Sequence, residues 1–161
     1  MTMLSIQQTP FPRIAAALLL VVALPGCGNS SPTPTGVGSA VITLTIAPNP
    51  IAAVPTSGST FVVRWTSTIK ETAGQGATVE LVEARLYDDA TGIVIAANAF
   101  DDKDLVVFVG SKRVEASSSL EIPQELSYTA TVKRAALLTV RVRVKDDKGN
   151  TLEQSLLVKV T

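Results

Sequence analysis

The sequence has no histidine and a single cysteine among its 161 residues. Histidine is the commonest acid/base group near neutral pH and the commonest metal ligand, so its absence disfavours the sites that depend on it. One cysteine cannot form an internal disulfide. Lysine plus arginine (14) equals aspartate plus glutamate (14), which argues against nucleic acid as a partner. Aromatic residues are only 4% of the chain, which disfavours a glycan site of stacked rings.

What is present at the start of the chain is an apolar run. Residues 14–24 are uninterrupted apolar residues, and Arg13 is the only charged side chain before them. A weakly basic segment followed by an apolar segment is typical of a secretory signal peptide. The run is shorter than the roughly 20 apolar residues that a membrane-spanning helix needs. We therefore expect residues 1–26 to be a cleaved signal peptide.

The only cysteine follows this run directly. Leu24-Pro25-Gly26-Cys27 resembles the lipobox of bacterial lipoproteins. The resemblance implies that Leu24 and Gly26 are recognised by the signal peptidase, and that Cys27 becomes the first mature residue, carrying a diacylglycerol thioether and an N-acyl group. It implies a cell-envelope location, with the outer membrane favoured in a Gram-negative host because Gly28, and not aspartate, follows the cysteine. The alternative is an incidental thiol after an ordinary cleavage site, or part of an uncleaved anchor.

The next segment is a predicted linker. Residues 28–40 are uncharged and rich in serine, threonine, proline and glycine, so they bury too little apolar surface to offset the entropy of ordering. We expect a lipidated cysteine and flexible linker over residues 27–40, with an extended reach of at most about 45 Å. Residues 41–161 are then one folded domain, and membrane lipid is the first expected partner.

Apolar residues in this domain alternate with polar ones, which is typical of half-buried antiparallel strands. Trp65 alternates in phase with its apolar neighbours, so we expect it in the core. The clearest segments cover residues 42–46, 61–69, 138–144 and 156–160.

Two turns share an Asp-x-x-Gly sequence. Aspartate suits the first position of a type I turn, and the glycine accepts the left-handed conformation that closes a hairpin. The two turns are Asp89 to Gly92 and Asp146 to Gly149. They pair strand 78–88 with 92–98, and strand 137–145 with 151–160.

Seven or eight short strands without a convincing helix predict an all-β fold, an antiparallel sandwich. Residues 117–134 are interpreted as two short strands broken at Pro123. The segment around Trp65 and the final hairpin resemble immunoglobulin-like and fibronectin type III-like domains of bacterial envelope proteins. That resemblance implies an immunoglobulin-like β-sandwich over residues 41–161.

Three acidic clusters are the strongest sequence indication of a metal-binding or catalytic site. Calcium prefers oxygen ligands of this kind, and paired carboxylates serve glycoside hydrolases. Aspartate is equally favoured in turns, which is our interpretation of all three. We expect the basic pairs Lys112-Arg113 and Lys133-Arg134 to be solvated. The clusters are Asp88-Asp89, Asp101-Asp102 with Asp104, and Asp146-Asp147.

These observations predict a membrane-anchored envelope lipoprotein whose single non-catalytic domain serves protein binding or a structural role. We expect no catalytic, cofactor or metal site and an envelope protein as the partner, which an exposed sheet edge would accept as an added strand. The alternatives are a calcium- or glycan-binding envelope module and, third, a hydrolase with paired carboxylates. A rise in melting temperature on adding calcium would favour the first alternative.

Overall fold

The structure is a computed structural model that describes residues 38–161. The predicted signal peptide, Leu24, Gly26, Cys27 and the linker up to residue 37 lie outside the described residues.

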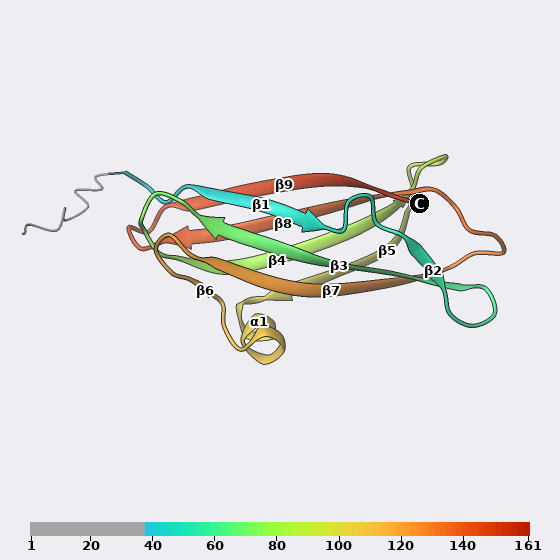
Figure 1. Ribbon diagram of the computed structural model, residues 1–161, viewed down its shortest axis with the longest axis horizontal. Helices are drawn as coiled ribbons and strands as arrows, with labels where there is room; N and C mark the ends of the chain where they lie inside the picture. Colours follow the sequence, from blue (N-terminus) through green and yellow to red (C-terminus); the bar gives the residue numbers. More distant parts are fainter. Residues whose placement is uncertain (1–37) are drawn as a thin grey trace, which may run out of the picture. The chain divides into compact units, whose positions relative to one another are not determined.

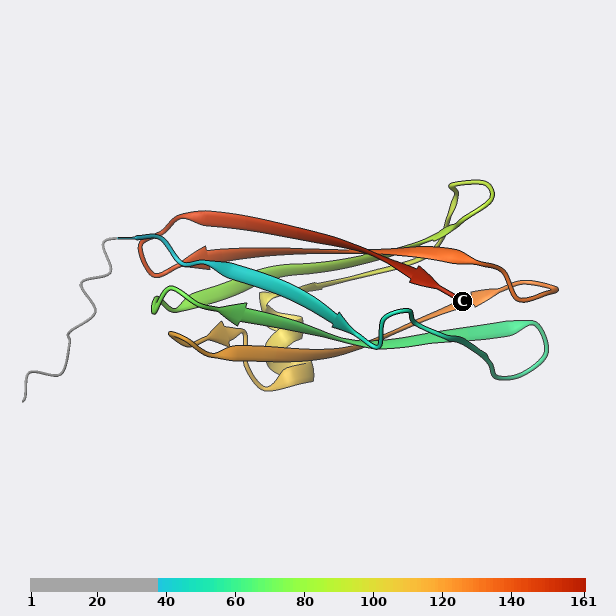
Figure 2. The ribbon, with the colours of Figure 1, turned by 45° about the horizontal axis from the view of Figure 1, so that its top comes forward.

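Within residues 38–161, nine strands form two antiparallel sheets that pack face to face (Figures 1 and 2). The first sheet contains β1 (Ile42–Ala47), β2 (Ala53–Pro55), β3 (Thr60–Glu71) and β7 (Ser119–Thr129). The second contains β4 (Ala77–Asp88), β5 (Val94–Asp101), β6 (Arg113–Val114), β8 (Ala136–Asp146) and β9 (Thr151–Val160). One helix, α1 (Asp102–Val109), follows β5 in this part of the chain.

The predicted all-β antiparallel sandwich is confirmed, with two very short strands, β2 and β6, raising the count above seven or eight. β8 shows why the alternation of apolar and polar residues predicts half-buried strands. Its valines Val140, Val142 and Val144 are buried, while the residues between them are partly or fully exposed. Each buried aliphatic side chain contributes about 1.5–3 kcal/mol. Trp65 is 3% exposed and lies in the core, as expected.

Both predicted hairpins form. β4 pairs with β5, and β8 pairs with β9. The second turn begins at Asp146 as expected, because the N–H of Gly149 donates to the Asp146 carbonyl at 2.9 Å. The first turn begins one residue earlier than predicted: the N–H of Gly92 donates to the carbonyl of Asp88, not Asp89, at 2.8 Å. Gly92 and Gly149 have positive φ values of 68° and 89°, which glycine adopts without strain.

The prediction of two short strands around Pro123 was wrong, because β7 runs without a break from Ser119 to Thr129. The side chain of Asn98 donates to the carbonyl of Glu125 from the side opposite β3. Backbone groups of alternate residues point to the same side of a strand. Pro123 belongs to this outward-pointing set, so its missing N–H costs the β3–β7 ladder no hydrogen bond.

The expectation of no helix was also wrong. Asp101 caps α1 by accepting from the N–H groups of Lys103 and Asp104, and the Asp104 side chain accepts from the Asp101 N–H in return. This reciprocal capping box stabilises a helix start. Gly110 ends the helix in the left-handed conformation, with a φ of 79°. The cluster of Asp101, Asp102 and Asp104 is therefore a helix start and not a simple turn.

The sandwich has two lateral sides. On one side β7 lies beside β5, and α1 contacts both; on the other side β1 lies beside β9. Figures 1 and 2 both place α1 and β9 on opposite sides of the sandwich. We call these the α1 side and the β9 side.

Candidate functional site

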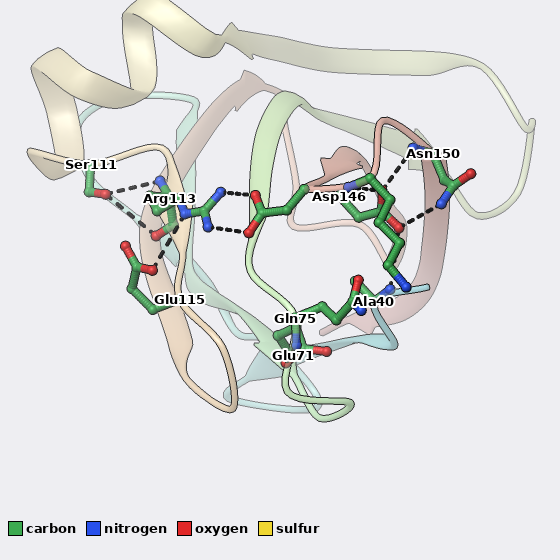
Figure 3. Close-up of polar contacts among 10 residues, drawn as sticks. Ala40, Glu71, Gln75, Ser111, Arg113, Glu115, Asp146 and Asn150 are labelled. Atoms are coloured by element: carbon green, nitrogen blue, oxygen red, sulfur yellow. Dashed lines mark hydrogen bonds and ion pairs between the residues drawn. The ribbon is translucent and has the colours of Figure 1, made fainter. Parts of the chain in front are cut away.

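The acidic residues at the end of the sandwich where the described chain begins hold backbone in place (Figure 3). The side chain of Asp146 accepts from the N–H groups of Lys148 and Asn150 at 3.0 and 2.8 Å, and from the N–H of Ala40 at 3.3 Å. The Asn150 amide adds a bond of 2.9 Å and is the main reason why the pKa of Asp146 lies below its ordinary value. Asp146 therefore closes the β8–β9 turn and fastens Ala40 to it.

Glu71 is fully buried and accepts from five backbone N–H groups. Burial alone raises the pKa of a carboxyl group, but these hydrogen bonds outweigh it and bring the pKa of Glu71 below its ordinary value. Glu71 therefore joins the end of β3 to the segments that precede β1, β4 and β7. The donors are Val41, Ala73, Gly74, Gln75 and Ser117, at 2.7–3.2 Å.

Arg113 forms a two-pronged ion pair with Asp147, with a bond of 2.6 Å between Nη2 and Oδ2. This pair is the main cause of the lowered pKa of Asp147. The guanidinium lies over Gly76, where an added Cβ would stand 2.0 Å from Nη2. Any side chain at Gly76 would displace the ion pair.

Lys133 and Arg134 are exposed, as predicted, whereas Lys112 and Arg113 are only partly exposed, and three of these four residues form ion pairs. Besides Arg113, Lys112 pairs with Asp102 at 2.6 Å, and Arg134 pairs with Asp88 at 2.9 Å. Asp88 is 2% exposed, and the Arg134 hydrogen bond is the main reason for its lowered pKa. Within residues 38–161 no three His, Cys, Asp or Glu side chains are grouped so that they could hold a metal ion. The carboxylates of Asp88 and Asp146 each accept from backbone N–H groups of the turn that follows them.

On the α1 side, the edge strands β5 and β7 are both covered. Pro123 offers no N–H there, the Asn98 amide occupies the Glu125 carbonyl at 3.4 Å, and α1 packs against β5 and β7. Proline, side-chain caps and covering helices are recognised means of preventing a strand from pairing with another chain.

The β9 side is open over most of its length. In the described part of the chain, only the end of β9 has a hydrogen-bonded outer neighbour, because the N–H of Ile51 donates to the Lys159 carbonyl at 3.1 Å. That bond shows that odd-numbered residues of β9 point their backbone groups away from β8. Among the described residues, no strand or loop pairs with the outward N–H and C=O groups of Glu153, Ser155 and Leu157.

An apolar strip accompanies this open edge. Leu44 of β1 and Leu152 and Leu156 of β9 are only partly buried against the core. Leu157, on the outer face, is 61% exposed. The β9 side therefore offers unpaired backbone groups together with apolar side chains, which is the combination that an added strand requires.

A second surface lies on the α1 side. We call Val106, Val107 and Phe108 the α1 tip; they are 47%, 80% and 69% exposed. A groove of about 660 Å³ runs between Phe108 and the outer face of the first sheet, and the Arg64–Glu125 ion pair (2.6 Å) lines it. The other lining residues are Ala47, Pro48, Trp65, Thr66, Phe100, Pro123 and Gln124.

Sequence reasoning missed Glu71 and the α1 tip. Glu71 lies in a strand-like segment, and nothing in the sequence identifies the three segments whose backbone N–H groups converge on it. The helix did have a local signal: Asp101 and Asp104 have the spacing of a capping box, and Gly110 occupies the C-cap position. The valine-rich residues between them favour a strand instead.

Comparisons with known proteins define the class of fold only. No protein-family model and no curated protein matches the chain. The crystal structure of a protein described as ApaA from Bordetella pertussis has a TM-score of 0.55 at 12% identity, covering 74% of this chain and 94% of that chain. Structural genomics target SoR45 has a TM-score of 0.52 at 10% identity, covering 74% and 85%. These likenesses support the antiparallel β-sandwich fold.

The helical part of residues 38–161 is too short and not apolar enough to span a bilayer.

Proposed function

We propose that this chain is a bacterial envelope lipoprotein that is anchored in a membrane through lipids on Cys27 and presents one non-catalytic sandwich domain to a protein partner. The anchor rests on the leader and on the resemblance of Leu24-Pro25-Gly26-Cys27 to a lipobox. The domain is proposed to be non-catalytic because the buried carboxylates of Glu71 and Asp146 already accept hydrogen bonds from backbone N–H groups.

The open edge of β9 is the observation that carries the binding proposal. An extended partner segment would add to the second sheet by hydrogen bonding to Glu153, Ser155 and Leu157. Main-chain bonds of this kind supply affinity, and alternate side chains supply specificity. The inward side chains of the partner would meet Leu152 and Leu156, so we propose a partner strand with apolar residues at alternate positions.

The anchor is tested with Cys27→Ser in the full chain. We expect the precursor to stay uncleaved or the protein to leave the membrane pellet, because the serine oxygen does not receive the diacylglycerol. Processing and membrane attachment identical to wild type would contradict the lipoprotein proposal.

The binding edge is tested by installing a photo-crosslinking amino acid at Glu153 in the envelope-located chain. Ser155→Pro removes an outward N–H but leaves the bonds between β8 and β9 intact, so the domain stays folded. We expect a crosslinked protein adduct in wild type and its loss in Ser155→Pro. Ser127→Pro is the matched control, because it removes an outward N–H from β7 on the covered side, and its adduct should persist. An adduct that survives Ser155→Pro would contradict strand addition.

A further inference from the structure

The α1 tip consists of three consecutive exposed apolar residues. Val106, Val107 and Phe108 follow one another in the last turn of α1, and Val107 is 80% exposed. Apolar residues exposed singly are ordinary, but a cluster of large ones marks an interaction surface.

The fold holds this tip in a fixed position. Leu105, 1% exposed, anchors α1 in the core, and the capping box fixes the start of the helix. The ring of Phe100 contacts the ring of Phe108 edge-on, with 5.3 Å between the two centroids. Lys112 ties the segment after the helix back to Asp102 at 2.6 Å. The exposure of the tip is therefore a feature of an ordered helix.

The helix that carries the tip, α1, projects from the side of the sandwich in Figure 1. Phe108 borders the groove, but Val106 and Val107 do not line it. A convex apolar tip fits a deformable lipid surface, into which short apolar segments bury their side chains at the boundary of headgroups and acyl chains.

We infer that the α1 tip inserts into the interface of the bilayer that holds the lipid on Cys27. This inference rests on the proposed lipoprotein function, which places a bilayer beside the domain. Eleven residues, 28–38, separate Cys27 from the domain, and they span at most about 40 Å. The bilayer is thus always within reach of the domain. Once the leader with Arg13 is cleaved, 13 basic and 14 acidic side chains remain, a net charge of −1, so apolar burial, and not attraction to anionic lipid, drives the contact.

Insertion of the α1 tip orients the domain. Because α1 and β9 lie on opposite sides (Figure 1), a domain resting on its α1 side presents the open edge of β9 away from the membrane. The partner strand would then approach from the aqueous phase.

The test uses the full lipidated chain in phosphatidylcholine vesicles. The Cys27 thiol is consumed in the thioether and the sequence has no other cysteine, so Val107→Cys provides a unique site for an environment-sensitive dye. Ser155→Cys, on the β9 side, is the matched control. We expect a blue-shifted dye at residue 107, at least five-fold protected from aqueous iodide relative to residue 155 and quenched by spin-labelled lipid. Adding Phe108→Ser should reduce the protection several-fold.

Each result decides between the proposals. Chains that float with vesicles but show equal iodide quenching at residues 107 and 155 would overturn tip insertion and leave the lipoprotein proposal standing. Chains that fail to float would overturn both, because the tip would have no adjacent bilayer. Protection that disappears when the protein is diluted into excess lipid would show contact with a second copy and overturn the inference.

Discussion

The two lateral sides of the sandwich differ in how far their edge strands are protected from pairing with another chain. On the α1 side, Pro123, the Asn98 amide and a whole helix keep the edges of β5 and β7 from pairing. On the β9 side, the backbone groups of Glu153, Ser155 and Leu157 are left without a strand or loop neighbour in the described part of the chain. Exposed edges are a liability that proteins usually suppress. Suppression of one edge and not the other is the contrast on which the proposed strand addition at β9 rests.

The largest expected effect is on the covered side. Leu105 is the only buried residue of α1, so Leu105→Ala should remove the anchor of the helix and destabilise the domain by about 2–5 kcal/mol. Val107→Ala on the same helix and Leu157→Ala on the β9 side, both well exposed, should stay within about 0.5 kcal/mol of wild type. Urea unfolding measures all three. A loss below about 1 kcal/mol in Leu105→Ala would show that the helix is held by other contacts.

An intermediate effect is expected at Glu71, which binds Val41 near β1 and Ser117 near β7 and so supports both sides. Glu71→Gln should cost about 1–3 kcal/mol at pH 7, because buried N–H groups lose a charged acceptor. The pKa of Glu71 is lower in the folded state than its ordinary value of 4.5. The stability that the carboxylate contributes is therefore present above about pH 4.5 and is lost as the pH falls through the lower, folded pKa.

Denaturant unfolding at several pH values measures this effect. The difference in unfolding free energy between wild type and Glu71→Gln should shrink as the pH falls below 4.5. A difference that does not change with pH would contradict the role assigned to the charge.

The smallest effect is expected at Pro123. Pro123→Thr restores an outward N–H on β7, but β5 and α1 already cover that edge. The variant should remain as monomeric as wild type in sedimentation experiments, and its stability should change by less than about 1 kcal/mol. New self-association would show that the proline, and not the helix, closes the α1 side.

Much of this architecture was predictable because strand periodicity and turn chemistry are local. The alternation from Leu138 to Val144 and the sequence from Asp146 to Gly149 predict the final hairpin, and the structure contains it. Trp65 was placed in the core by the same alternation. Each of these predictions depends only on residues that are close together in the sequence.

The features that decide which side is open depend on distant residues. Pro123 was interpreted as a strand break because its tolerance depends on which way its backbone points, and pairing with β3 sets that direction. The helix was missed because Val106, Val107 and Phe108 favour strands, whereas capping and the burial of Leu105 favour the helix. Glu71 and Arg134 were not assigned their roles because Ser117, which binds Glu71, and Asp88, which binds Arg134, each lie 46 residues away in sequence.

The fastening of the first described residues to the β8–β9 hairpin has a mechanical consequence. Ala40 bonds to Asp146, Ser39 accepts from Asn150 at 3.3 Å, and the Gly38 carbonyl accepts from Lys148 at 2.8 Å. A pull transmitted along the chain from residue 38 reaches this hairpin directly. Since β9 is the second strand of the hairpin, tension between a membrane anchor and a partner bound to β9 would reach the hairpin through these contacts as well as β1 through the covalent chain.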